Sequence, residues 1–194
     1  MTSQTSLTIQ GFPASTYKPT ITDRELLIIG SHPNAVREYG SCLYTIGIRD
    51  TMLINRSYDL LRRAGYTGCV TNVYVATMHS AECGVHKNFP PSSLPDGATI
   101  IGQNVNGAES KYIDQVVDWS PPGGTSALFA CVCGIYLGYA SMHLIGVHLD
   151  EEPYNDEAVF QRWREWAPAL RGRVTSSSTL VEKLINEGID NIGE

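Results

Sequence analysis

One stretch of the chain, residues 124–150, constrains the fold more than any other. It begins at a glycine-rich turn, continues with an apolar segment over 125–137 that is long enough for a buried helix, and breaks at Gly138. A second apolar run over 142–147 follows at once and has the length of a strand. A turn, a buried helix, a tight connection and a strand are the rhythm of an α/β unit. We therefore expect an α/β fold.

Short apolar runs also recur before this unit, at spacings that leave room for helices. Such runs are typical of strands buried on both faces, as in a parallel sheet. They cover residues 25–30, 50–55, 68–73 and 98–102. Helices are expected from residue 35 onward and over 58–64, 156–167 and 177–186. The pattern predicts a three-layer Rossmann-like domain, with an open, mostly parallel sheet of five or six strands flanked by helices.

The first 23 residues are polar and rich in Ser and Thr, and we expect them to form an N-terminal arm before a single domain over 24–194. Within the arm, residues 6–10 alternate polar and apolar side chains, which predicts an edge strand. The arm lacks the basic and apolar regions of a secretory signal. No apolar run reaches the roughly 18 residues that cross a bilayer. We therefore expect a cytoplasmic protein without a membrane span.

Composition excludes several classes of function. The chain of 194 residues has a formal net charge of −6, which argues against a footprint for duplex nucleic acid. Its five cysteines include no CxxC spacing, which favours reduced, mostly buried thiols over a zinc site.

Candidate binding residues follow the expected strands, because ligands of open α/β sheets bind at the carboxyl ends of strands. These residues are Gly30, Ser31 and His32 after the first strand, Asn55 and Arg56 after the second, and Asn72 in the third. The asparagines could hydrogen-bond a base, a ribose or a phosphate, and the arginine could neutralise a phosphate. Neither GxGxxG nor a P-loop follows the first strand, which argues against a dinucleotide cofactor and Walker-type ATP hydrolysis.

The start of the long helix, at Gly124, Thr125 and Ser126, is a second candidate. Free backbone N–H groups and two hydroxyls at a helix N-terminus form an anion site. A plain Ser/Thr N-cap explains the same residues, so both interpretations stay open.

His148 and Asp150 follow the last strand of the unit. They could be a general base with a nearby carboxylate, a pair of metal ligands, or two surface polar residues. The acidic residues Glu151 and Glu152 could hold Mg²⁺, and a solvated helix N-terminus explains them equally well.

Three aromatic residues, Phe160, Trp163 and Trp166, recur at helical spacing, which favours a core or an interface. A homo-oligomer through this helix is a further expectation.

The segment 125–149, from "TSA" through "LGY" to an apolar strand, resembles a motif shared by two related groups. One is the bacterial lipooligosaccharide sialyltransferases, and the other is the archaeal-type hydroxymethylpterin pyrophosphokinases and their relatives. Both have a "TSG"-like turn, "LGY" or "LGF", and a strand ending "GxD". Residues 27–34 look like their "GxGPSL" opening. In this chain His32 stands where the families usually have glycine, and His148 stands at the acid position.

The resemblance implies a Rossmann-like domain that binds a nucleotide or a nucleotide sugar. It implies that Ser31 and His32 lie by the phosphates. It implies that Asn55 and Asn72 lie by the ribose or sugar, and that Thr125 and Ser126 contact the nucleotide. Tyr154 is expected near the leaving phosphate by its position in the chain.

We therefore expect a transferase, most simply a glycosyltransferase that requires no cofactor and acts on an unidentified acceptor. His148 would act as the base, with Asp150 beside it and Tyr154 or Arg56 stabilising the leaving group. One alternative is pyrophosphoryl transfer from ATP, with Mg²⁺ held at Asp150 and Glu151. The other is a nucleotide-binding protein without catalysis.

Overall fold

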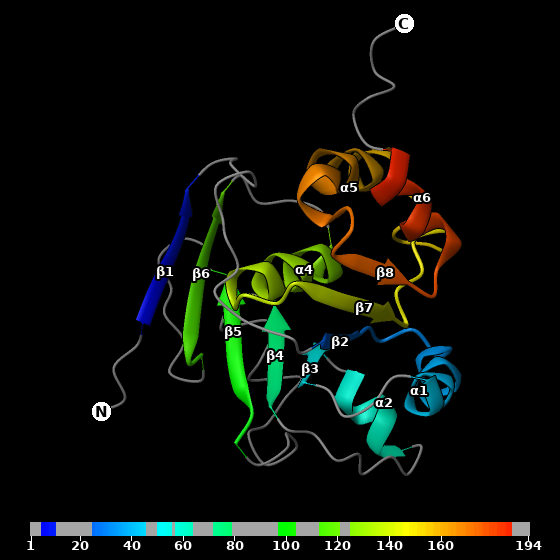
Figure 1. Cartoon of the computed structure of the whole chain (residues 1–194), viewed down its shortest axis with the longest axis horizontal. Helices are drawn as coiled ribbons and strands as arrows, with labels where there is room; N and C mark the ends of the chain where they lie inside the picture. The colour runs from blue at the N-terminus through cyan, green and yellow to red at the C-terminus, as the bar shows by residue number, and fades with distance from the viewer. Residues whose placement is uncertain are drawn as a thin grey trace, which may run out of the picture.

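The computed structural model describes residues 5–10, 25–45, 50–55, 57–63, 72–78, 97–103, 113–120 and 125–187 (Figure 1). Within these ranges the strands are β1 (Thr5–Gln10), β2 (Glu25–Ile29), β3 (Asp50–Ile54), β4 (Val73–Thr77), β5 (Thr99–Gln103), β6 (Gln115–Ser120), β7 (Ser141–Ile145) and β8 (Val174–Ser176). The helices are α1 (Ala35–Thr45), α2 (Ser57–Arg63), α4 (Ser126–Tyr136), α5 (Glu157–Leu170) and α6 (Thr179–Glu187).

All the strands belong to one sheet, with the order β1-β6-β5-β4-β3-β2-β7-β8. Every neighbouring pair is parallel. The expected open α/β fold with a parallel sheet is therefore confirmed. Six strands form its centre, and β1 and β8 add an edge strand on either side. β1 pairs with β6, which confirms the edge strand expected over residues 6–10.

The strand order reverses at β2. From β2 to β6 each new strand is added on one side, and the chain then returns through α4 to place β7 on the other side of β2. Such a switch point opens a crevice beyond the carboxyl ends of the two strands that flank it. The topology therefore places a crevice at the ends of β2 and β7.

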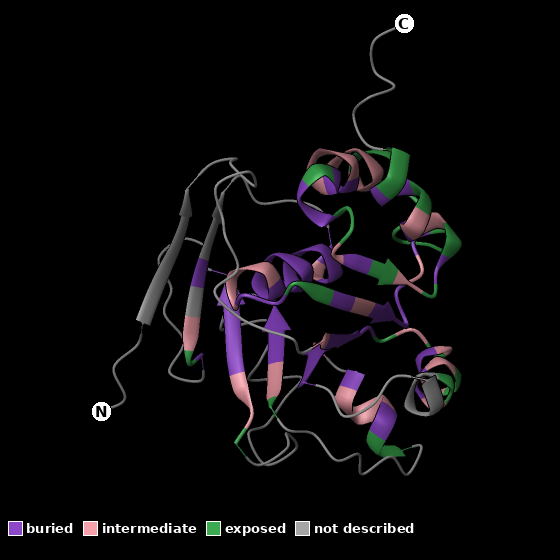
Figure 2. Ribbon diagram, viewed as in Figure 1, coloured by how far each residue is buried: buried purple, intermediate pink, exposed green. Residues whose placement is uncertain are grey.

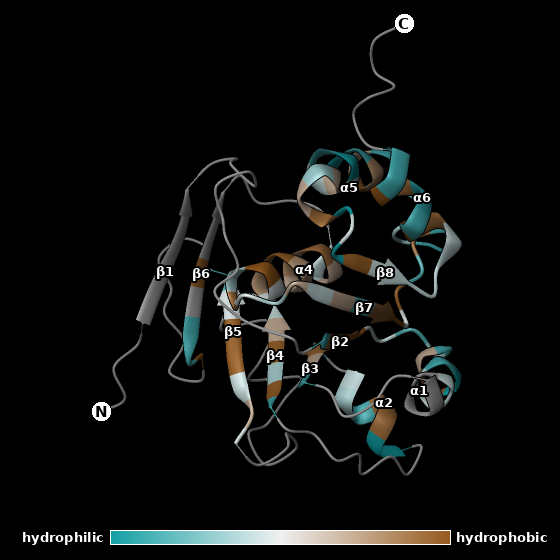
Figure 3. Ribbon diagram, viewed as in Figure 1, coloured by the Kyte–Doolittle hydropathy of each residue, from teal (hydrophilic) through white to brown (hydrophobic). Residues whose placement is uncertain are grey.

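The two faces of the sheet have separate cores. Alternate residues of a strand point to opposite faces, so Leu26 and Ile28 pack with α4, α5 and α6, whereas Leu27 and Ile29 pack with α1 and α2. Helix α4 lies across β2, β3 and β4, and Figure 2 shows it buried over most of its length. Figure 3 shows the matching hydropathy, with apolar residues on α4 and the central strands and polar ones on the outer turns of α5 and α6.

One expected strand is misplaced, and two strands were not expected. The third run was expected to form a strand over 68–73, but β4 covers Val73–Thr77, and residues 64–71 lie outside the described part of the chain. β6 and β8 were not expected, because neither carries an unbroken apolar run: β6 reads QVVDWS and β8 has three residues. Polar side chains are tolerated near the edges of a sheet, so the apolar-run criterion misses such strands.

Helix α5 extends three residues beyond the expected end at Ala167 and contains Pro168. Proline removes one backbone hydrogen bond, but Ala169 and Leu170 are buried and stabilise the last turn. Trp163 is fully buried, and Phe160 and Trp166 pack partly buried against the same core. The aromatic stripe therefore belongs to the core of this chain, and a homo-oligomer stays a prediction.

Cys131 and Cys133 are free, buried thiols of α4, as expected, and burial raises the pKa of both. The side chains of the other three cysteines lie outside the described residues. No helix in the described ranges combines the length and the apolar character that crossing a membrane requires.

Candidate functional site

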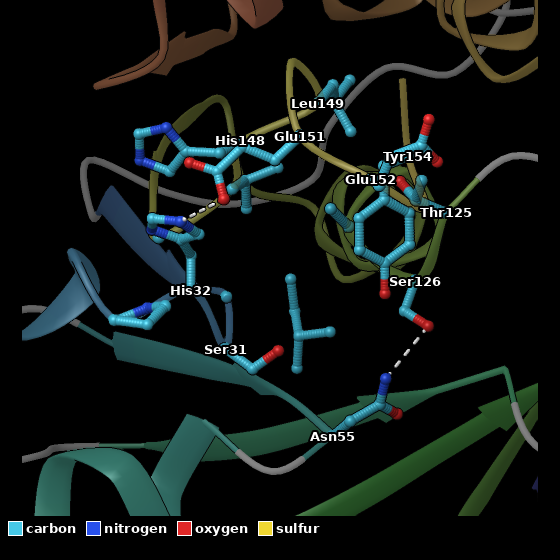
Figure 4. A pocket seen from close by; sticks show the side chains of 16 residues that line it. Ser31, His32, Asn55, Thr125, Ser126, His148, Leu149, Glu151, Glu152 and Tyr154 are labelled. Carbon is cyan, nitrogen blue, oxygen red and sulfur yellow. Dashed lines mark hydrogen bonds and ion pairs between the residues drawn. The ribbon is translucent and has the colours of Figure 1, made fainter. Parts of the chain in front are cut away.

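A pocket of about 230 Å³ opens at the switch point (Figure 4). Five segments build it: the turn after β2, the end of β3, the start of α4, the turn after β7, and the loop before α5. The lining residues are Gly30, Ser31, His32, Pro33, Ile54, Asn55, Thr125, Ser126, Ala127, Gly146, Val147, His148, Leu149, Glu151, Glu152 and Tyr154. Binding pockets for small molecules span roughly 300–1,000 Å³, so this one suits a small ligand or part of a larger one.

Two glycines allow the turns after β2 and β7 to pack against each other. A Cβ on Gly30 would collide with the carbonyl oxygen of Gly146. Gly146 has a φ of +61°, and its own Cβ would collide with Ala35. The His32 N–H donates to the Gly146 carbonyl at 3.2 Å, which joins the turns. Gly30 therefore allows the backbone of the turn after β2 to lie close to the backbone of the turn after β7.

Asn55 lies at the end of β3 with a φ of +49°, a left-handed conformation that asparagine tolerates. Its amide nitrogen donates to Ser126 Oγ at 3.1 Å. Its side-chain oxygen, Oδ1, is buried and has no hydrogen-bond partner among the described residues. The end of β3 therefore reaches the start of α4, and it leaves one acceptor unpaired beside the pocket.

Thr125 is the N-cap of α4, and its Oγ1 accepts the Leu128 N–H at 3.3 Å. Ser126, the first residue of the helix, lines the pocket together with Thr125 and Ala127. The helix start therefore faces the cavity, and a helix N-terminus favours an anion. The N-cap role and the anion-site interpretation are compatible here.

Two histidines stack on one wall of the pocket, with ring centroids 4.2 Å apart and planes tilted by 37°. His32 Nε2 lies 3.0 Å from Glu151 Oε2, and its Nδ1 accepts the Asn34 N–H at 3.2 Å. His148 Nε2 lies 3.0 Å from Glu38 Oε1. Each imidazole therefore has its own carboxylate partner (Figure 4 shows the first pair).

Glu38 belongs to the candidate site, and no sequence pattern pointed to it. It lies in the first turn of α1, and its second carboxylate oxygen accepts the Gly146 N–H at 2.7 Å. An acidic residue in a first turn is common, because it complements the helix dipole. Its partner is 110 residues away, so no local pattern signals the contact.

Asp150 and Tyr154 differ in their relation to the pocket. Asp150 Oδ1 lies 3.9 Å from His148 Nδ1, but its side chain is 62% exposed and does not line the cavity. Tyr154 lines the cavity and is 47% exposed. The two acidic residues of the lining are Glu151 and Glu152, and no Lys or Arg is among the described residues that line it.

The structure does not bring Asn72 to this site. It lies just before β4, at the amino end of the strand, because β4 starts later than expected. Its side chain donates to Asp50 Oδ1 at 3.0 Å, at the opposite edge of the sheet from the pocket. The expected position of Asn72 at a carboxyl end is therefore wrong. Arg56 and Gly124 lie outside the described residues.

No family model, curated protein or solved structure matches this chain. The fold is therefore established by strand order and packing alone. The resemblance to the sialyltransferases and pyrophosphokinases rests on its motifs, and what it implies about ligand and reaction stays an expectation.

Proposed function

We propose that this chain is a transferase that binds a nucleotide or nucleotide sugar in the pocket and transfers the glycosyl group. One observation carries the proposal: the start of α4, with Thr125 and Ser126, faces the crevice between the ends of β2 and β7. Nucleotides bind open α/β sheets at such switch points, with phosphate at a helix N-terminus.

The polar groups around the pocket fit the parts of a nucleotide. Phosphate oxygens would accept from the N–H groups of α4 and from the hydroxyls of Ser31 and Ser126. The unpaired carbonyl oxygen of Asn55 would accept from a ribose hydroxyl or an exocyclic amine, which removes the cost of leaving it unpaired. The proposal therefore assigns neutral donors, and no lysine or arginine of the described lining, to the phosphates.

His148 is the proposed general base of the transfer. It takes the proton of the acceptor hydroxyl, whose oxygen bonds to the anomeric carbon. The bond from that carbon to the phosphate oxygen breaks, and the leaving nucleotide keeps the electron pair. The Tyr154 hydroxyl donates to that leaving phosphate, and Asp150 stabilises the imidazolium that forms. General base catalysis of this kind contributes about 10²–10⁴-fold in rate.

A second candidate, Mg²⁺-dependent pyrophosphoryl transfer from ATP, has support from three successive acidic residues, Asp150, Glu151 and Glu152. The fit is poorer, because Glu151 is engaged with His32. No group of three or more His, Cys, Asp and Glu side chains in the described ranges has an arrangement that could hold a metal ion. A third candidate is a protein that binds the nucleotide without turnover.

A thermal-shift screen tests the proposal with CMP, UDP, their sugar conjugates and ATP, each with and without Mg²⁺. At about 100 times Kd a ligand stabilises the fold by about 2.7 kcal/mol. Stabilisation by a CMP or UDP compound without Mg²⁺, followed by sugar transfer, supports the glycosyltransferase. Stabilisation by ATP only with Mg²⁺ favours pyrophosphoryl transfer, and ligand binding without turnover favours the third candidate. No stabilisation across the panel contradicts all three.

The variant Ser126→Asp locates the site. A carboxylate in a first helical turn is tolerated by the helix dipole, but it repels a phosphate bound there. Thr179→Asp is the matched control, because Thr179 is the first residue of α6 and is exposed. We expect Ser126→Asp to abolish the ligand-induced shift and Thr179→Asp to retain it.

A further inference from the structure

We infer that Glu38 is a positioning residue that fixes the tautomer of His148 and leaves Nδ1 as the nitrogen that takes up the proton. The use of that nitrogen as a base rests on the proposed function. The tautomer itself is a property of the free protein.

The carboxylate of Glu38 determines where the hydrogen of His148 lies. A carboxylate accepts hydrogen bonds and has none to donate, so His148 Nε2, at 3.0 Å from Glu38 Oε1, carries the hydrogen. Nδ1 then carries the lone pair. The Glu38 side chain is 11% exposed and that of His148 is 16% exposed, so little water competes for the contact.

The backbone holds Glu38 in place for this task. Its other oxygen accepts the Gly146 N–H at 2.7 Å, so the carboxylate is attached to the same turn that carries His148. One side chain of α1 therefore fixes both the turn after β7 and the ring within it. Partners that orient an imidazole through its second nitrogen are a general feature of histidine sites.

His32 cannot serve as the base in the same way, because both of its nitrogens are engaged. Nδ1 accepts the Asn34 N–H, so Nε2 carries the hydrogen and donates to Glu151. By contrast, the polar atom near His148 Nδ1 is Asp150 Oδ1 at 3.9 Å, which is beyond hydrogen-bond distance. Among the residues that the structure describes, His148 is the ring of the stacked pair whose Nδ1 has no hydrogen-bond partner.

Carboxylates from two segments flank the stacked histidines. Glu38 faces His148 from α1, while Asp150 and Glu151 lie near the two rings in the loop after β7. His32, stacked at 4.2 Å, packs against the ring of His148 and limits its rotation.

The variant Glu38→Gln tests the inference without any ligand. In this variant only the side-chain oxygen of the glutamine can accept the Gly146 N–H. The side-chain NH₂ group therefore faces His148 Nε2 and donates to it. Nε2 then becomes the acceptor and the hydrogen moves to Nδ1. Two-bond nitrogen–proton NMR spectra of the labelled full chain report this directly at the alkaline plateau of the histidine titration, with His148→Gln assigning the signals.

We expect the Nε2–H tautomer of His148 in the native chain and the Nδ1–H tautomer in Glu38→Gln. The matched control is Glu151→Gln, the same chemical change beside the other histidine. There the Asn34 N–H still occupies His32 Nδ1, so both rings keep Nε2–H. Glu38→Asp keeps an acceptor and should keep the native tautomer, and unfolding curves establish that each variant is folded.

An Nδ1–H tautomer in the native chain overturns the inference, as does a folded Glu38→Gln variant that retains Nε2–H. A tautomer switch in Glu38→Gln alone supports it. If the switch occurs but no nucleotide stabilises the protein, the positioning role stands and the proposed function fails. The two failures are therefore distinguishable.

Discussion

The parallel strands start along one side of the sheet, the amino edge, and end along the other, the carboxyl edge. Each of these two sides holds a polar cluster, and the clusters differ in how completely their polar groups are paired. At the amino ends of the strands, Asp50 is 2% exposed and accepts from Asn72 at 3.0 Å and from the Tyr139 hydroxyl at 2.6 Å. Tyr139 also meets the Tyr74 hydroxyl at 3.4 Å. Both carboxylate oxygens of Asp50 thus have partners within the chain.

At the carboxyl ends, the cluster around the pocket is left incomplete. The carbonyl oxygen of Asn55 has no partner among the described residues, and His148 Nδ1 is 3.9 Å from the nearby Asp150 carboxylate. Buried polar groups are normally satisfied, so an unpaired acceptor at a cavity supports the bound ligand that we propose. The amino edge is therefore paired within the chain, whereas the carboxyl edge leaves polar groups available for the ligand that we propose.

The largest expected effect is on turnover at the carboxyl edge. His148→Gln should lower kcat with a nucleotide sugar by about 10²–10⁴-fold, because it removes the proposed base. Glu38→Gln should lower kcat with little change in KM, because it moves the hydrogen onto Nδ1. Steady-state kinetics on the donor identified by the screen measure both effects, and Glu187→Gln, the same change at an exposed residue outside the pocket lining, is the control. Full activity in His148→Gln would show that another group takes the proton.

The next effect is on stability at the amino edge. Tyr139→Phe removes a donor from a buried carboxylate, and leaving such a group short of a partner costs about 1–3 kcal/mol. Urea unfolding should show this loss, while the nucleotide-induced shift of the variant stays native. Tyr74→Phe is the control and should cost less, since its contact is longer and the residue is half-buried. Loss of ligand binding in Tyr139→Phe would break the division between the edges.

The same tyrosine predicts a pH dependence. Burial, followed by the hydrogen bond to Asp50, raises the pKa of Tyr139 far above its ordinary value. The unfolded chain loses this proton near the ordinary tyrosine pKa of about 10, whereas the folded chain keeps it. The contribution of Tyr139 to stability is therefore fully present below that pH and is lost as the pH rises beyond it. Unfolding curves measured across this pH range give the free energy of unfolding. It should fall more steeply with rising pH for the native chain than for Tyr139→Phe.

The sequence predicted the centre of the sheet better than its periphery. Strands β2, β3 and β7 are buried on both faces, so they read as apolar runs that stand out in the sequence. β6 and β8 carry polar residues, so they gave no such signal. Asn72 was predicted to lie at the end of a strand, because residues 68–73 were taken as that strand. The strand β4 begins only at Val73, so Asn72 lies before it.

The candidate site was partly predictable because several of its residues follow strands or start a helix. Gly30, Asn55 and Ser126 have such local signals, and the structure gathers them around one pocket. Glu38 has none, because its role depends on packing that brings α1 next to the turn after β7. Long-range pairing of this kind is set by topology, which local patterns do not specify.

The smallest expected effect concerns Asn55, whose side chain has one paired group and one unpaired group. Asn55→Gly keeps the left-handed backbone at no steric cost but removes the bond to Ser126 and the unpaired acceptor. Losing one hydrogen bond to a ligand costs about 0.5–1.5 kcal/mol, so nucleotide affinity should fall by up to about tenfold. Asn55→Asp keeps the acceptor and separates the two roles. Its affinity should stay closer to native for a ligand group that donates to position 55, as isothermal titration would show. If nucleotide affinity fell further in Asn55→Asp than in Asn55→Gly, the new carboxylate would be repelling a phosphate. The ligand group that faces Asn55 would then be the phosphate and not the ribose or base.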